Sequence, residues 1–387
     1  MEILKKFNNL VNNKKTILGV GPMSLNCVDA SIELSNKYNI PIILIASRRQ
    51  IDCEEFGGGY VNNWNTKLFS NYIKLKDKKK NIILARDHGG PWQNNIETDK
   101  KFNLNNAMQS AKLSFEQDIK NNFKIIHIDT SIDIHKNLDF KNSFDRLCEL
   151  YSFCVTKSRE LKKKIIFEIG TEEQNGTTNT PLELKKTLNL FYKYCNRKKF
   201  QLPTFVVVQS GTKVMETKNV GSFESPLRVK NELPVEIQLP KMIEICNEHN
   251  IYMKEHNADY LSLDSLKWHP KIGIHAANVA PEFGVTETKS ILNILNENNL
   301  KVFKEKFLEL SYESRKWQKW MLPHSAATDY HKSIISGHYI FSTTSFLNLK
   351  NEIHLTLKKR GINLDNYLKE KIKINILKYL KAFNLVK

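Results

Sequence analysis

Eight runs of strand-forming residues recur along the chain, and polar or charged side chains follow each run directly. Examples are IILARDHGGP at 82–91, IIHIDTSID at 125–133 and IYMKEHNADY at 251–260. A buried strand that ends in His, Asp, Glu or Asn carries polar groups where packing alone does not favour them. In a parallel barrel the carboxyl ends of all strands meet on one rim, where active sites lie. The repetition therefore predicts an α/β fold, a (β/α)8 TIM barrel with its active site at the carboxyl ends of the strands.

Helix-like segments separate these runs, with a βα period of about 40 residues. The chain has 387 residues, more than the roughly 250 that such a barrel needs. Beyond Gly284 the pattern is helical and no further polar strand end follows. We therefore expect a barrel over residues 1–284 and a helical appendage over 285–387, which covers the barrel or forms a subunit contact. A loop-rich segment over 218–235 is expected to border the site as a lid.

The composition limits the classes of protein to which the chain can belong. The chain has 59 Lys and Arg against 41 Asp and Glu, a formal charge of +18. No nucleic-acid motif accompanies the lysines, so we interpret them as solvated faces and expect no nucleic-acid partner. No apolar run approaches the roughly 18–20 residues that span a bilayer, and residues 1–15 lack the pattern of a signal peptide, which predicts a cytoplasmic protein without a membrane partner. The six cysteines are scattered, which predicts neither a zinc cluster nor disulfides.

Several strand ends carry metal-binding or proton-transferring side chains. Asp87 and His88 end one run and precede two glycines, which allow a sharp turn beside a ligand. Asp129, Glu168 and His256 stand at three other strand ends. Each of them, taken singly, is compatible with an ordinary hydrogen-bonded loop residue. Two histidines and a glutamate around one rim predict a site for a divalent cation, most simply Zn²⁺, with an open coordination position.

Other strand ends offer groups that bind anions. Arg48 and Arg49 predict a clamp for phosphate or carboxylate at the barrel mouth. The alternative for these arginines is a structural ion pair with Asp52, Glu54 or Glu55. The segment 210–212, Ser-Gly-Thr, and an asparagine at 278 lie where barrel loops commonly hold phosphate.

Two further features favour structural roles. The three glycines at 57–59 do not have the spacing of a nucleotide-binding loop, and we interpret them as a mobile loop near the site. The aromatic and histidine residues beyond 284 are expected to be packing or interface residues. They are Trp317, Trp320, His324, His331 and His338.

The motifs at the strand ends resemble those of a known family. They are DHGGP at 87–91, IDTS at 128–131, IGTE at 169–172, VVQSG at 207–211 and EHNADY at 255–260. Together they resemble the accessory-subunit family of tagatose-bisphosphate aldolase, which is related to the class II, metal-dependent fructose- and tagatose-bisphosphate aldolases. The resemblance covers residues from about 18 to 284 and implies a TIM barrel that binds phosphorylated ketoses.

The resemblance also implies roles for single residues. Asp87 matches the aspartate that delivers a proton to the aldehyde oxygen, and Asn278 matches the asparagine that contacts the dihydroxyacetone phosphate portion. Gln209 stands where the aldolases carry a histidine ligand, so Glu168 or Glu172 has to complete the metal shell. The whole predicted site consists of Asp87 and Glu172 as catalytic residues, of His88, Glu168 and His256 as metal ligands, and of Arg48, Arg49, Asp129, Gln209, Ser210, Gly211, Asn257, Asp259 and Asn278 as substrate ligands.

Two functions follow from these observations. The first is a metal-dependent sugar-phosphate aldolase, a carbon–carbon lyase that converts a phosphorylated ketose into an aldehyde and dihydroxyacetone phosphate. The second is a non-catalytic subunit that stabilises a separate aldolase, which is consistent with glutamine at 209. In either case we expect a homo-oligomer, with a partner aldolase subunit as the further possibility in the second.

Overall fold

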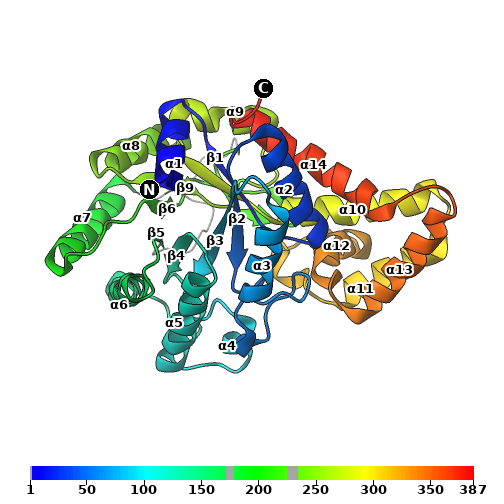
Figure 1. Ribbon diagram of the computed structural model, residues 1–387, viewed down its shortest axis with the longest axis horizontal. Coiled ribbons are helices and arrows are strands. Elements are labelled where there is room, and N and C mark those ends of the chain that lie inside the picture. Colours follow the sequence, from blue (N-terminus) through cyan, green and yellow to red (C-terminus); the bar gives the residue numbers. More distant parts are fainter. Residues whose placement is uncertain (1, 171–177, 179, 225–233) are drawn as a thin grey trace.

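Eight parallel strands close into a barrel, so the predicted TIM barrel is confirmed (Figure 1). The computed structural model describes residues 2–170, 178, 180–224 and 234–387. Around the barrel the strand order is β1-β10-β9-β6-β5-β4-β3-β2. The strands are β1 (Ile17–Val20), β2 (Ile42–Ser47), β3 (Ile82–Gly89), β4 (Ile125–Asp129), β5 (Ile166–Gly170), β6 (Phe205–Val208), β9 (Tyr252–Glu255) and β10 (Ala276–Val279).

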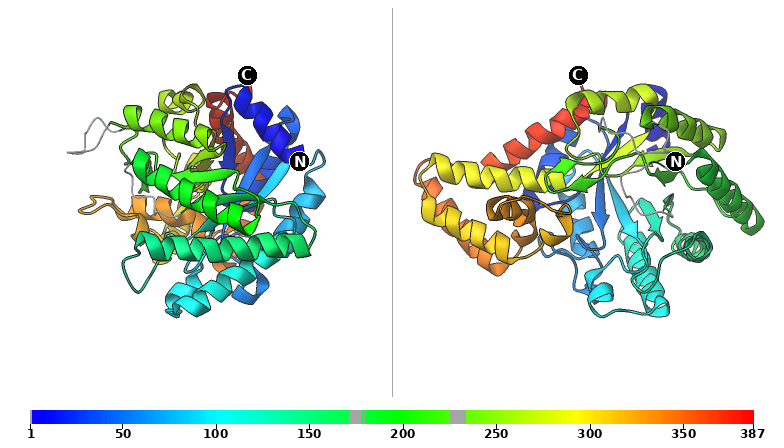
Figure 2. Two further views of the ribbon diagram at one scale, coloured as in Figure 1. Left: turned by 90° about the vertical axis from the view of Figure 1, so that its left-hand side faces the viewer. Right: turned by 180° about the vertical axis from the view of Figure 1, so that it is seen from behind.

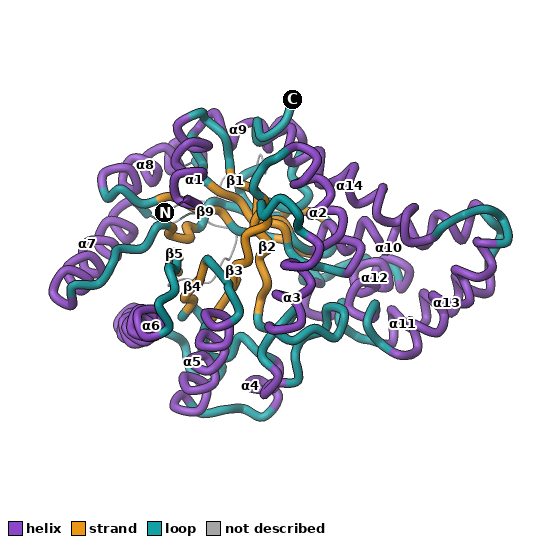
Figure 3. The backbone as a smooth tube through the Cα atoms, viewed as in Figure 1, coloured by secondary structure: helices purple, strands orange, loops and turns teal. Residues whose placement is uncertain are grey.

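Helices surround the strands on the outside (Figure 3). Those of the barrel are α1 (Glu2–Asn12), α2 (Leu25–Tyr38), α3 (Thr66–Lys76), α4 (Asn95–Asp99), α5 (Leu104–Lys120), α6 (Phe140–Glu160), α7 (Pro181–Lys198), α8 (Val235–Glu248), α9 (Leu263–Ile272) and α10 (Pro281–Glu297). Local sequence sets their ends. At α7, for example, Thr180 and Glu183 form a reciprocal capping box, and Pro181 occupies the first turn, where no amide donor is needed.

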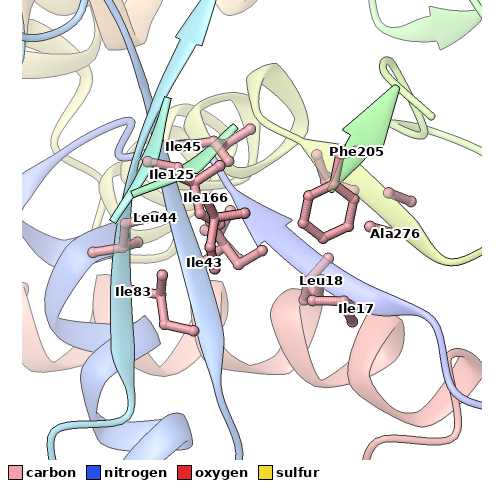
Figure 4. Close-up of a cluster of buried hydrophobic side chains, with 14 of the residues drawn as sticks. Ile17, Leu18, Ile43, Leu44, Ile45, Ile83, Ile125, Ile166, Phe205 and Ala276 are labelled. Carbon is pink, nitrogen blue, oxygen red and sulfur yellow. The ribbon is translucent and has the colours of Figure 1, made fainter. Parts of the chain in front are cut away.

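Strand residues alternate between the barrel interior and the surrounding helices, and this alternation divides the interior into two levels. Isoleucines and Phe205 pack together at the amino-terminal level (Figure 4). Burial of each such side chain contributes about 1.5–3 kcal/mol. In two strands the position two residues further along is polar: His127 and then Asp129 follow Ile125 in β4, and Glu168 follows Ile166 in β5. The apolar level thus supports a polar level at the carboxyl ends.

The residues after α10 form an extension on one side of the barrel (Figures 1 and 2). It contains α11 (Lys301–Glu313), α12 (Asp329–Ser336), α13 (Thr344–Lys358), α14 (Leu364–Ala382) and the short 3₁₀ helices η2 (Gln318–Trp320) and η3 (Gly337–Ile340). The extension has its own apolar core, which includes Phe307 and Phe346. The helix α14 returns to pack against α2 and α10, and its Ile372 and Tyr379 belong to the barrel core. The expected division at residue 284 lies within α10.

Two short elements complete the described structure: the 3₁₀ helix η1 (Glu54–Phe56), and a hairpin of β7 (Val214–Met215) and β8 (Lys218–Asn219). Part of the predicted lid at 218–235 lies outside the described residues. In the described part of the chain, no helix combines the length and apolarity needed to cross a membrane.

Candidate active site

A cavity of about 550 Å³ opens at the carboxyl ends of the barrel strands. Its volume is in the range of sites for small molecules. The strand ends contribute one side of the lining, including Asp87, His127 and His256. The extension contributes the other side, through the region around η2 and through Tyr339 of η3.

Four buried side chains bring their ligand atoms together at the base of this cavity: Asp87, His127, Glu168 and His256. Asp87 Oδ1 lies 3.7 Å from both His127 Nδ1 and His256 Nε2. Glu168 Oε1 lies 3.8 Å from His127 Nδ1 and 3.3 Å from His256 Nε2. Ligand atoms bonded at about 2.0–2.2 Å to one tetrahedral ion stand about 3.3–3.6 Å apart. The spacing therefore fits a single divalent cation.

The chemistry of the donor set also fits a cation. The backbone N–H of His88 lies 3.2 Å from His127 Nδ1, so this nitrogen is the acceptor of the ring, and it stands 3.7 Å from Asp87 Oδ1 and 3.8 Å from Glu168 Oε1. Lone pairs and carboxylate oxygens repel each other at these distances unless a positive charge lies between them. Burial lowers the pKa of His256, which keeps its imidazole neutral and able to bind a metal.

The two carboxylates remain ionised in this setting. Burial opposes the ionisation of Glu168, but the Lys254 ammonium outweighs it and lowers the pKa of Glu168 to about 2. Lys254 Nζ lies 2.7 Å from Glu168 Oε2, which leaves Oε1 facing the histidines. Burial likewise opposes the ionisation of Asp87, yet the adjacent His88 holds its pKa well below the usual range. Lys254 is thus a site residue that the sequence did not predict.

His127 takes the place that we predicted for His88. The ring of His88 faces other groups: Nδ1 is 2.6 Å from Asp129 Oδ2, and Nε2 is 3.3 Å from His256 Nδ1. The predicted convergence of His88 and His256 is present, with ring centroids 4.9 Å apart. His88 is, however, a neighbour of the four-residue group and not a member of it, so its assignment as a ligand is corrected. The alternation of side chains in β4 could have identified His127, because this residue lies on the same face of the strand as Asp129.

A backbone irregularity turns the His88 ring towards Asp129. The register between β3 and β4 shifts between Arg86 and Gly89, and His88 has φ 45°, in the left-handed region that a non-glycine residue rarely occupies. Such strained conformations persist where the surroundings over-determine them, often at functional sites. Burial opposes protonation of His88, but Asp87 and then Asp129 raise its pKa to about 9.

A glycine leaves room for the imidazole of His127. A Cβ atom on Gly170 would stand 2.7 Å from His127 Nε2. We predict that Gly170→Ala displaces this ring and weakens binding of a divalent metal about 10- to 100-fold, the range seen when groups that orient metal ligands are altered. Competition with a chromogenic chelator measures the affinity, and circular dichroism establishes that the variant is folded. A folded variant with wild-type metal affinity would contradict the role assigned to Gly170.

The two predicted arginine ligands have different environments. Arg48 is fully buried; its Nε lies 2.9 Å from Asp52 and its Nη1 lies 2.5 Å from Glu97. It does not line the cavity, so the prediction that Arg48 binds substrate is wrong, because the alternative ion pair with Asp52 uses its guanidinium. Arg49 points the other way and lines the cavity.

Some of the remaining predicted substrate ligands line the cavity, and others do not. Asp129, Asn257, Asp259 and Asn278 line the cavity, and the Asn278 amide donates to Asp87 Oδ1 at 3.2 Å. Burial raises the pKa of Asp259 to about 7, although backbone N–H groups of 280 and 282 donate to its carboxylate.

Three predicted substrate ligands follow β6, and none of them lines this cavity. They are Gln209, Ser210 and Gly211, and their predicted contact with phosphate stays a prediction. The loop after β6 supports the strand end of β9, since Thr212 Oγ1 donates to the carbonyl of His256 at 2.6 Å. The predicted catalytic Glu172 lies outside the described residues.

One aromatic residue of the extension departs from its expected role. Trp320 lines the cavity and donates from Nε1 to Tyr339 Oη at 3.0 Å. His338 is buried, as expected for a packing residue. Trp320 was missed as a cavity residue because only the folded extension brings it to the barrel mouth.

A closed parallel barrel with carboxylates and histidines at its strand ends defines a TIM barrel with a candidate metal site at its rim. No protein-family model and no curated protein matches the chain. Solved structures do. A probable tagatose 6 phosphate kinase from Sinorhizobium meliloti 1021 has a TM-score of 0.69 and 15% identity, covering 95% of this chain and 100% of that one.

Two further structures belong to enzymes that act on sugars. The fructose-bisphosphate aldolase from Campylobacter jejuni has a TM-score of 0.53 and 12% identity, with 100% of this chain and 94% of that one covered. The fructuronate-tagaturonate epimerase UxaE from Cohnella laeviribosi has a TM-score of 0.57 and 11% identity, with 96% and 81% covered. At these identities the similarity concerns the fold. It shows the TIM-barrel fold and does not support the accessory-subunit family.

Proposed function

We propose that this protein is a metal-dependent carbon–carbon lyase that cleaves a phosphorylated ketose into an aldehyde and dihydroxyacetone phosphate. The observation that carries the proposal is the convergence of Asp87, His127, Glu168 and His256, whose ligand atoms all lie within 4.8 Å of one another, with carboxylate–imidazole distances of 3.3–3.8 Å. The aldolase among the similar structures has the same fold and supports the proposal. Turnover of fructose 1,6-bisphosphate and tagatose 1,6-bisphosphate, followed through the released dihydroxyacetone phosphate, tests it.

The residues divide into those that hold an ion and those that contact substrate. His127, His256 and Glu168 are the proposed ligands, a donor set known from catalytic zinc sites with an open position. A divalent ion such as Zn²⁺, when bound there, polarises the ketose carbonyl as a Lewis acid. Lys254 neutralises the second oxygen of Glu168 and keeps its carboxylate oriented.

Asp87 is the proposed proton-transfer group. It lines the cavity, whereas Glu168 lies beneath it. In the cleavage direction the hydroxyl next to the scissile bond gives its proton to the Asp87 carboxylate and becomes the aldehyde carbonyl. The electron pair of the broken carbon–carbon bond passes to the ketone fragment. The Asn278 amide, 3.2 Å from Asp87 Oδ1, orients the carboxylate.

Asp87→Asn is expected to lower kcat about 10²-fold or more, because an amide cannot accept the proton. The metal content is expected to stay within about twofold of the wild type, since three ligands remain. Cleavage assays and metal analysis on the same preparation test both statements. Asp145→Asn, at an exposed position on α6, is the matched control and should leave both quantities unchanged. Full activity in Asp87→Asn would remove the proposed role of this residue.

A non-catalytic subunit is the second candidate. It is favoured by the ammonium group of Lys254, which already compensates one charge of Glu168 without any metal. In that case the purified protein would bind no divalent ion and cleave no ketose phosphate, and it would raise the activity or stability of a co-expressed aldolase.

A further inference from the structure

The cavity lining contains both acidic and basic side chains. The acidic residues lie at the strand ends, next to the histidines, as described above. The basic residues Arg49, Lys316 and Lys319 line the same cavity; Arg49 follows β2, and the two lysines belong to the extension. Lys319 belongs to η2, and Lys316 precedes it in the link from α11. The extension therefore adds positive charge to a site whose acids come from the barrel.

The basic residues lack the acidic partners that cations of the fold usually have. Among the described residues none of the three forms an ion pair, whereas the adjacent Arg48 is fully paired with Asp52 and Glu97. The acids nearest to Arg49 are also engaged, because Glu97 pairs with Arg48 and Asp129 with His88. Unpaired cations that face a common cavity are suited to bind an anion.

The surrounding groups hold these cations in place. Lys319 Nζ lies 4.8 Å from the ring centre of Trp320 and 5.1 Å from that of Tyr339, which are cation–π distances. Nearby protein atoms and then the Arg49 cation lower the pKa of Lys319 to about 7, although the lysine reaches solvent at the cavity mouth. The charge of Arg49 also opposes the rise in the pKa of His88. Arg49 is thus close enough to both His88 and Lys319 to influence their charges.

We propose that Arg49, Lys316 and Lys319 form an anion-binding subsite that holds the terminal phosphate or carboxylate of a sugar whose carbonyl end faces Asp87 and His256. The extension, and not the loop after β6, then selects the substrate class: linear polyhydroxy ketones with an anionic terminus. The orientation of the ligand rests on the proposed function, whereas the anion-binding subsite does not.

Binding is measured by calorimetry with three probes: fructose 1,6-bisphosphate, fructuronate and neutral fructose. The wild type is expected to bind at least one anionic probe more tightly than fructose. Arg49→Gln and Lys319→Gln should each weaken that binding about 10- to 100-fold, as expected for the loss of a hydrogen bond to a charged group. Tighter binding of the bisphosphate assigns the subsite to phosphate, and tighter binding of fructuronate assigns it to carboxylate.

The controls separate this subsite from the proposed chemistry. Lys359→Gln, an exposed lysine at the end of α13, is the matched variant and should bind as the wild type does. Metal content should be unchanged in all three variants. A protein that cleaves no ketose but shows this pattern of binding would refute the proposed function alone. Equal affinity for fructose and both anions, or wild-type affinity in Arg49→Gln and Lys319→Gln, would refute the subsite.

Discussion

Replacement of His127 by alanine is expected to reduce the bound divalent metal to background and to lower ketose-phosphate cleavage about 10³-fold. The imidazole is one of two nitrogen donors in the four-residue group, 3.7 Å from Asp87 and 3.8 Å from Glu168. Its loss leaves two buried carboxylates with one histidine. Lewis-acid stabilisation by a bound metal contributes several kcal/mol to the transition state, where about 4 kcal/mol corresponds to a factor of about 10³. Metal analysis after gel filtration and steady-state cleavage rates measure the two effects.

His331→Ala, at an exposed position on α12, is the matched histidine control. It should retain both metal and activity. Treatment of the wild type with a chelator should reproduce the loss in His127→Ala, and added Zn²⁺ should restore activity to the wild type only. Unchanged metal content in folded His127→Ala would mean that this group does not hold the ion.

Asp118→Asn is expected to lower the free energy of unfolding by about 3–5 kcal/mol. Arg86 and Asp118 form a bidentate ion pair at 2.6 and 2.7 Å between β3 and α5, and both side chains are fully buried. Removing one partner leaves the other charge buried without compensation, which is the costly case for interior ion pairs. Arg86 also donates to the carbonyls of 46 and 51, so it cannot move into solvent without breaking these bonds. Urea unfolding followed by circular dichroism measures the change.

An exposed ion pair provides the control. Asp264 is 90% exposed and lies 3.3 Å from Lys267, so Asp264→Asn should change stability by less than about 1 kcal/mol. The double variant Arg86→Met/Asp118→Leu should recover part of the lost stability, because it removes both charges. If Asp118→Asn were as stable as the wild type, the pair would not contribute as described.

Local patterns anticipated the barrel and the part of the site that lies on strand ends. The strands β3 and β4 start at Ile82 and Ile125, the first residues of two predicted runs, because alternating or continuous apolar residues bounded by turns specify a strand locally. Glu168 and His256 were identified for the same reason. His127 was not, since a histidine within a strand looks like a core residue until its neighbours across the barrel are known.

Arg48 and Arg49 illustrate what local patterns leave open. The two residues are identical and adjacent, and either could have faced the cavity. The fold decides between them, because the acids Asp52 and Glu97 stand on the side of Arg48 and no acid of the described chain pairs with Arg49. Charge compensation across elements is a long-range property that periodicity does not encode.

The sequence alone determined the architecture: eight strands with polar ends, separated by helices, have one common solution in a parallel barrel whose chemistry collects at one rim. The tertiary structure alone decided which histidine joins the carboxylates, which arginine meets the cavity, and that Lys316 and Lys319 of the extension face it. The physical reason is the separation along the chain of the residues that interact. Secondary structure follows from interactions between near neighbours in the chain, whereas a site is an arrangement of charges brought together from distant segments.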